Sequence, residues 1–123
     1  MILEDDAVLV GGFAGRLNTA MKELPDDWNA LWLNGTEVKK GIDIGKHLKK
    51  VREMWGTFGY VINENFYDLA IEGLKKEVSS ADGFFTSVQR KNQVFATKHP
   101  LVKHLEGFSE IAGETVSRYK HLA

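Results

Sequence analysis

The sequence predicts an α/β protein with a mixed sheet flanked by helices, on three observations. A short, almost wholly apolar run at residues 28–33 ends at Asn34-Gly35, which is typical of a strand buried on both faces. Segments with apolar residues at helical spacing stand on either side of it in the chain. Of the 123 residues, 43% are hydrophobic and 2 are proline, so the chain can bury a core. We expect a single domain over residues 1–123.

In the first half of the chain, the expected elements are an apolar strand interrupted by acidic residues, a helix, the buried strand and a long polar loop, at residues 2–10, 13–24, 28–33 and 36–47. Gly11-Gly12 ends the first segment, and Pro25 ends the helical pattern. Two glycines, Gly41 and Gly45, favour the loop.

In the second half, we expect two short strands within residues 48–62 and helices at residues 66–78 and 79–88. A further strand is expected at residues 94–96 and a closing helix at residues 113–122. Asn63 or Asn65 is expected to cap the first of these helices. Its expected apolar face comprises Phe66, Leu69, Ala70, Leu74 and Val78. Residues 101–102 are expected to resume the strand at 94–96 after His99-Pro100.

Charge and composition exclude several classes of protein. With 16 Lys and Arg against 17 Asp and Glu, the chain lacks the basic excess of a nucleic-acid-binding domain. Without cysteine it has no disulfide or thiol nucleophile, which fits a reducing compartment, and we expect a cytoplasmic location. No apolar run reaches the roughly 20 residues of a membrane-spanning helix. Basic residues around the 36–47 loop leave peripheral membrane contact open, beside a simply solvated loop.

Three consecutive acidic residues, Glu4, Asp5 and Asp6, follow the first apolar residues. Adjacent carboxylates repel one another, and a hard divalent cation such as Mg²⁺ or Mn²⁺ compensates that repulsion through oxygen ligands. In open α/β sheets, ligands bind at the carboxyl ends of strands. The triplet therefore predicts either a cation site or a solvated acidic turn.

Five segments follow one another in the order of the motifs of a known family. They read ILEDDA, LWLNG, GTFGYVI, SADGFF and HPLV leading to GFSEI, at residues 2–7, 31–35, 56–62, 80–85, 99–102 and 107–111. Together they resemble glycosyltransferase family 25, which includes bacterial lipooligosaccharide transferases and collagen galactosyltransferases. The resemblance spans nearly the whole chain.

The resemblance implies an A-type glycosyltransferase fold and metal-dependent transfer of a hexose from a nucleotide sugar, with UDP expected, to a saccharide or glycan acceptor. It assigns the binding of Mn²⁺ or Mg²⁺ and of the diphosphate to Asp6 and Glu4, with Asp5 between them as a further binding residue. Glu4 departs from a strict D-x-D motif. His99, just before the Pro-Leu segment, is the expected late histidine ligand, with His104 as the other candidate.

Asp82 is the expected catalytic carboxylate, which would deprotonate the acceptor hydroxyl in an inverting transfer. The alternative is that Asp82 caps the helix that follows. For His99 the alternative is a solvated histidine. Tyr60 and Trp55 are candidates for stacking on sugar, or for the core.

The length of 123 residues bears on the activity, because the resemblance begins at the acidic motif. It predicts the metal- and acceptor-side half of a larger enzyme, without the N-terminal nucleotide-binding units. The alternative is an inactive fragment or a carbohydrate-binding or interaction module. A two-metal phosphoryl-transfer enzyme ranks last, because no second carboxylate cluster stands at a recognisable spacing. The first strand would leave an open sheet edge, which a second copy in a homo-oligomer would cover.

Overall fold

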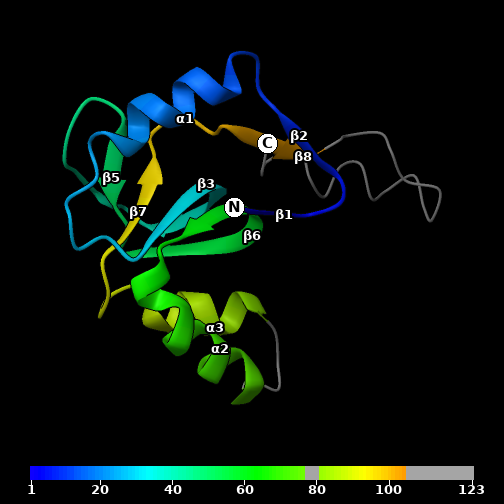
Figure 1. The fold of residues 1–123 in the computed structure, drawn as a ribbon, viewed down its shortest axis with the longest axis vertical. Coiled ribbons are helices and arrows are strands. Elements are labelled where there is room, and N and C mark those ends of the chain that lie inside the picture. Colours follow the sequence, from blue (N-terminus) through cyan, green and yellow to red (C-terminus); the bar gives the residue numbers. More distant parts are fainter. Residues whose placement is uncertain (77–80, 105–123) are drawn as a thin grey trace.

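A computed structural model describes residues 1–76 and 81–104 of the chain, which form a mixed α/β fold (Figure 1). A six-stranded sheet has the order β1-β6-β3-β7-β5-β4, and β2 and β8 form a second, two-stranded sheet. The strands are β1 (Ile2–Leu3), β2 (Ala7–Leu9), β3 (Ala30–Lys39), β4 (Ile42–Asp43), β5 (Leu48–Lys50), β6 (Glu53–Ile62), β7 (Val94–Thr97) and β8 (Val102–His104). The helices are α1 (Phe13–Met21), the 3₁₀ turn η1 (Glu64–Phe66), α2 (Tyr67–Lys76) and α3 (Ala81–Val88). The predicted α/β class is confirmed.

The central strand β3 is antiparallel to β6 and parallel to β7. Its first residues are buried on both faces of the sheet, as the apolar run predicts: Leu31 and Leu33 are 0% exposed and Trp32 is 1% exposed. Ala30 and Trp32 contribute to one apolar cluster, and Leu31 and Leu33 to another. This division follows from the alternation of side chains along a strand.

Different elements cover the two faces of the large sheet (Figure 1). The first cluster packs beneath η1, α2 and α3, which contribute Phe66, Ala70, Phe84 and Phe85. The second packs beneath α1 and the small sheet, which contribute Phe13, Leu17, Ala20 and Val102. The sheet is thus the middle layer of three.

An aromatic group anchors the first cluster. The rings of Trp32 and Tyr60 stack with centroids 4.7 Å apart, and Phe85 meets Trp32 edge-on at 5.1 Å. The indole N–H of Trp32 donates to the Gly56 carbonyl at 2.7 Å, which satisfies the polar atom of this buried ring. Tyr60 is therefore a core residue, and its predicted alternative role in sugar stacking is wrong. Trp55, in contrast, is 41% exposed.

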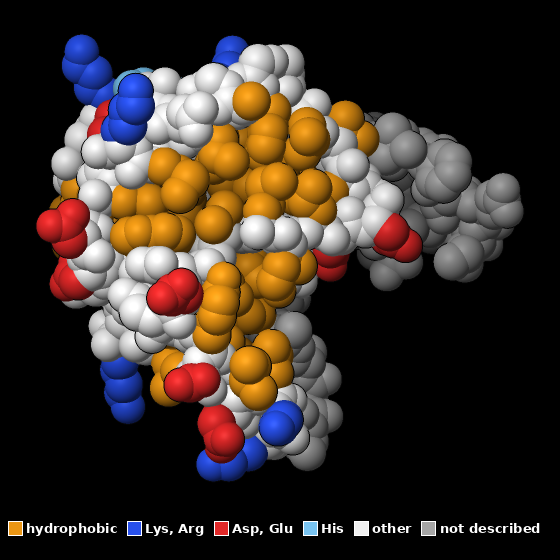
Figure 2. Space-filling model, in the orientation of Figure 1, with side chains coloured by type: hydrophobic (Ala, Val, Ile, Leu, Met, Phe, Trp, Pro, Cys, Tyr) orange, Lys and Arg blue, Asp and Glu red, His pale blue; other side chains and the backbone are white. Residues whose placement is uncertain are grey.

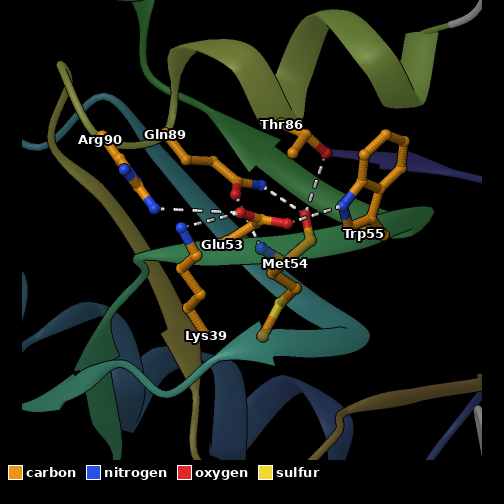
Figure 3. A network of polar contacts seen from close by, with 7 residues as sticks. All are labelled: Lys39, Glu53, Met54, Trp55, Thr86, Gln89 and Arg90. Atoms are coloured by element: carbon orange, nitrogen blue, oxygen red, sulfur yellow. Dashed lines mark hydrogen bonds and ion pairs between the residues drawn. The ribbon is translucent and has the colours of Figure 1, made fainter.

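A buried amide side chain joins α3 to β6 (Figure 3). Gln89 is 1% exposed, and it accepts from the Met54 backbone N–H at 2.8 Å and donates to the Met54 carbonyl at 2.7 Å. Thr86 Oγ1 also donates to this carbonyl, at 3.2 Å. Because β1 pairs only with the Gly59–Tyr60 part of β6, Gln89 takes the place of a neighbouring strand at Met54.

Three sequence expectations were wrong. The predicted loop at 36–47 contains the end of β3, which pairs with β6 as far as Lys39, and the short β4. Cross-strand ion pairs stabilise this polar stretch, among them Lys39–Glu53 at 3.7 Å. Residues 101–102 do not resume β7, because Val102 begins β8 in the other sheet. On α2, Leu69 and Leu74 are 44% and 40% exposed, so the buried face is narrower than expected. The expected helix at 113–122 lies outside the described residues.

Candidate functional site

The acidic triplet lies in a tight turn between β1 and β2. The Ala7 N–H donates to the Glu4 carbonyl at 3.1 Å, which closes a four-residue turn, and the Glu4 N–H donates to the Phe58 carbonyl at 3.1 Å. Thr57 Oγ1 donates to the Glu4 carboxylate at 3.2 Å. The turn, which we call the acidic turn (residues 4–6), is thus fastened to β6, with Glu4 and Asp5 exposed.

Segments far apart in the sequence meet beside this turn. In the register of β1 with β6, Ile2 lies opposite Tyr60 and Leu3 opposite Gly59. On the far side, Leu9 lies opposite Val102. The Asn34 side-chain amide donates to the Val102 carbonyl at 2.7 Å and is itself buried. Segments 2–7, 31–35, 56–62 and 99–102 therefore form one connected unit.

His99 does not share a site with the acidic turn. β8 runs antiparallel to β2 with His104 opposite Ala7 and Val102 opposite Leu9, so His99 lies beyond the far end of β2 from Asp6. Across residues 1–76 and 81–104, no three His, Asp or Glu side chains are grouped closely enough to hold a metal ion. The oxygen donors of the turn suit Mg²⁺ or Mn²⁺, and such a cation would complete its shell with water and substrate oxygens.

The predicted catalytic residue, Asp82, is the second residue of α3. This helix packs on the sheet face opposite α1 and the small sheet. Its carboxylate is not among the side chains that the structure describes, so the choice between a base and a helix-start residue remains a prediction.

A cavity of about 470 Å³ lies beneath α1. Its wall combines one side of α1 as far as Ala20 with the residue before β5, the end of β7 and the segment that follows β7. The lining residues are Gly12, Gly15, Arg16, Thr19, Ala20, His47, Thr97, His99 and Leu101. His99 is the one sequence-predicted site residue that this cavity contains, and we call the whole the α1 cavity.

A histidine–carboxylate pair forms one side of the α1 cavity. The His47 ring Nδ1 contacts the Glu23 carboxylate, and the His47 backbone N–H donates to the same carboxylate at 3.0 Å. The hydrogen bond from the His47 ring, followed by the one from its backbone, lowers the pKa of Glu23. On the other side of the residue, the Lys98 N–H donates to the His47 carbonyl at 2.9 Å. His47 is therefore held at its ring and at both backbone groups.

Gly45 makes room for this pair. A Cβ atom at position 45 would lie 2.6 Å from Glu23 Oε1, so a larger residue would displace the carboxylate. Because a carboxylate only accepts hydrogen bonds, Nδ1 carries the hydrogen. The other ring nitrogen, Nε2, is the one available to a ligand in the cavity, and in the neutral ring it is an acceptor.

The opposite side of the α1 cavity carries positive potential. Gly12, with φ of 71°, is the N-cap of α1 and leaves the first helical N–H groups without a side-chain cap. Arg16 is exposed on the next turn, and it has no ion-pair partner among the described residues. A helix N-terminus with an adjacent guanidinium favours an anionic group.

Sequence reasoning missed the α1 cavity, although one signal for it was present. Residues 11–16 read GGFAGR, a glycine-rich junction between a strand and a helix followed by arginine. It does not match a phosphate-loop pattern, and its glycines alone indicate only a break between two elements. His47 and Glu23 carried no signal, because only the pairing of β5 with β7 brings the loop at 45–47 beneath the end of α1.

The comparisons with known proteins leave the function to be argued from the site. No protein-family model, no curated protein and no solved structure matches this chain. Across the described residues, none of the helices combines the length and the apolar character that crossing a bilayer requires.

Proposed function

We propose that this chain belongs to a metal-dependent glycosyltransferase with the A-type fold, which moves a hexose from a nucleotide sugar, with UDP expected, to a saccharide or glycan acceptor. One observation carries the proposal: the segments that resemble family 25 motifs contact one another in the fold. Sequence order alone does not require this, because the segments in contact extend from residue 2 to residue 102. The GFSEI part of the resemblance, at residues 107–111, lies outside the described residues.

Four contacts join these segments in the fold. The acidic segment pairs with GTFGYVI through Leu3 opposite Gly59, and Thr57 of that segment donates to Glu4 at 3.2 Å. The Leu101 N–H of HPLV donates to the Leu33 carbonyl of LWLNG at 2.9 Å. The SADGFF segment joins through Phe85, whose ring lies 5.0 Å from that of Tyr60.

The acidic turn supplies the chemistry that the transfer needs. A bound Mn²⁺ or Mg²⁺ would neutralise the charge of the departing nucleoside diphosphate. Asp6 and Glu4 are the proposed ligands, with Asp5 as the further carboxylate of the turn. Thr57 and the Phe58 carbonyl fix the position of Glu4 before any ligand arrives. On the acceptor side, Asp82 remains the proposed base.

Thermal unfolding with Mn²⁺ and UDP tests the proposal. A ligand that binds only the folded protein raises the melting temperature, so we expect an increase for the unmodified chain. Asp6→Asn should remove it, whereas Asp27→Asn, which changes an exposed carboxylate elsewhere, should retain it. An equal increase in both variants would contradict the cation site.

The alternative of an inactive or carbohydrate-binding module predicts a different result. Such a chain would bind saccharides in calorimetric titration while giving no heat with UDP, with or without Mn²⁺. Release of UDP from a UDP-hexose, abolished by Asp6→Asn, would favour the transferase over the module.

A further inference from the structure

We propose that the α1 cavity is a second ligand site, which binds a small saccharide carrying one anionic group, either a sugar phosphate or a sugar acid. The site is separate from the acidic turn, because β2 runs between them: the acidic turn precedes Ala7, and Gly12 follows the other end of the strand.

Arg16 and the start of α1 recognise the anionic group. The guanidinium keeps its charge at any physiological pH and offers paired donors that match a carboxylate or a phosphate. The backbone N–H groups that follow Gly12 have no side-chain cap, and they lie at the positive end of the helix dipole. Both features favour an anion at this end of α1. The positive charge of Arg16 also disfavours a metal cation as the occupant.

Thr97 points to a ligand independently of the helix. The residue is 8% exposed, and among the described residues its Oγ1 is a buried side-chain oxygen for which the structure shows no hydrogen-bond partner. A buried hydroxyl without a partner is unfavourable by about 1–3 kcal/mol, so such groups are rare in native structures. Thr97 lines the α1 cavity, and a rotation of its side chain that turns Oγ1 toward the cavity would let an oxygen atom of a ligand satisfy it.

His47 recognises a hydroxyl group. The Glu23 carboxylate holds the ring by Nδ1 and leaves Nε2 for a ligand hydroxyl, as an acceptor in the neutral ring and as a donor in the protonated ring. The Thr19 hydroxyl, which donates to the Gly15 carbonyl at 2.9 Å, keeps its acceptor lone pairs and can also accept from a ligand O–H. The cavity thus presents an anion-binding end and a hydroxyl-binding end.

The remaining lining favours a saccharide over a bare anion. Ala20 and Leu101 are apolar and buried, and the C–H face of a sugar ring can pack on them. The volume of about 470 Å³ lies within the usual range for small-molecule sites and far exceeds the size of an inorganic anion.

Titration with four probes, followed by amide chemical shifts of the ¹⁵N-labelled chain, tests this inference. Glucose 6-phosphate or glucuronate should saturate the site and shift the signals of Gly12, Arg16 and Thr97, and the stronger of the two identifies the anion. Glucose and inorganic phosphate should each bind at least about tenfold more weakly, since each makes only part of the contacts. Equal binding of inorganic phosphate and both saccharides would overturn the saccharide assignment.

Substitutions in the α1 cavity separate specific ligand binding from the general effect of removing a charge. Arg16→Gln should weaken binding of the anionic saccharide by about tenfold or more, the loss expected for a charge-assisted hydrogen bond. Lys22→Gln, which removes an exposed cation at the other end of α1, should change it less than twofold. Thr97→Val should also weaken binding, while Glu23→Gln should affect the saccharides and spare inorganic phosphate. No shifts at the cavity, or equal effects of Arg16→Gln and Lys22→Gln, would overturn the proposal.

The acidic turn and the α1 cavity can be tested independently of each other. Asp6→Asn should leave the binding of the anionic saccharide unchanged, and Arg16→Gln should leave the response to Mn²⁺ and UDP unchanged. Loss of both responses in either variant, with folding intact by circular dichroism, would contradict two separate sites.

Discussion

At the scale of single residues, the contact between His47 and Glu23 depends on a neighbour that has no side chain. Gly45 leaves the space through which the Glu23 carboxylate reaches the His47 ring and backbone. Glu23 follows α1 and His47 precedes β5, so the pair also ties the helix to the sheet. Neither residue stands in a recognisable motif, which is why sequence reasoning could not place them together.

The contact makes stability depend on pH. The His47 ring and backbone hold the pKa of Glu23 below its usual value of 4.5. The contact therefore contributes stability that is present above about pH 4.5 and is lost as the pH falls through the lower pKa of the folded state. Denaturant unfolding at a series of pH values should show an advantage over Glu23→Gln above this range that disappears below it. An advantage that grows with acid would contradict the assignment.

Gly45→Ala tests whether the Glu23 carboxylate needs the space beside Gly45 to reach His47. Because the atom that a new Cβ would meet is the end of a flexible side chain, we expect Glu23 to move away and the fold to persist. NMR titration should then find the pKa of Glu23 closer to its usual value than in the unmodified chain. An unchanged pKa of Glu23 would show that its carboxylate does not need the space beside Gly45.

At the scale of elements, single residues decide how the helices join the sheet. Gln89 replaces a strand neighbour for Met54, and Gly73 lets α2 approach α3. Both features follow from long-range packing, and sequence reasoning anticipated neither. It did find α1 and α2, whose apolar residues stand at helical spacing, and also α3 and β7. It missed the outer part of β3, because polar residues paired across a sheet surface resemble a loop.

Gln89→Ala should be strongly destabilising. The change leaves the N–H and carbonyl groups of Met54 without the Gln89 amide, and we expect a loss of about 2–4 kcal/mol in the free energy of unfolding. Arg90→Ala, which removes an adjacent and more exposed side chain, should change it by less than about 0.5 kcal/mol. Urea denaturation measures both, and equal effects would contradict the role given to Gln89.

Alanine substitutions at two helical glycines, Gly73 and Gly15, should change the stability of the fold in opposite directions. A Cβ at Gly73 would lie 1.9 Å from a ring carbon of Phe84, so Gly73→Ala should destabilise the fold by about 1–3 kcal/mol through overpacking. A Cβ at Gly15 would have no neighbour within 4 Å, so Gly15→Ala should stabilise α1 by about 0.5–1 kcal/mol. Thermal unfolding distinguishes the two signs. Phe84→Leu should partly rescue Gly73→Ala, and a failure to do so would contradict this contact.

At the scale of the whole molecule, β1 is the edge strand of the large sheet, and an apolar groove adjoins it. Figure 2 shows hydrophobic side chains gathered over the middle of this face of the molecule. The groove is lined by Met1, Ile2, Ile62, Tyr67, Ala70, Ile71 and Leu74. An open edge at the first strand was expected from the sequence, and β1 does stand at the end of the strand order. The groove was not expected, since it depends on how α2 lies against β1 and β6.

The expectation that a second copy covers this edge remains a prediction. Because apolar surface and an unpaired strand edge both favour association, light scattering should show a dimer at high protein concentration. Ile71→Glu places a charge in the groove and should shift the protein to the monomer, whereas Glu72→Gln on the same helix should not. A monomer at every concentration would remove the expectation.

We propose above all that the acidic turn binds a divalent cation together with a nucleoside diphosphate. Paramagnetic broadening by Mn²⁺ in the presence of UDP tests it most directly, since the effect is confined to amides near the ion. We expect broadening of the signals of residues 4–6 and of Thr57, which donates to Glu4, with loss of the effect in Asp6→Asn. Broadening centred elsewhere, or the same pattern in Asp6→Asn, would contradict it.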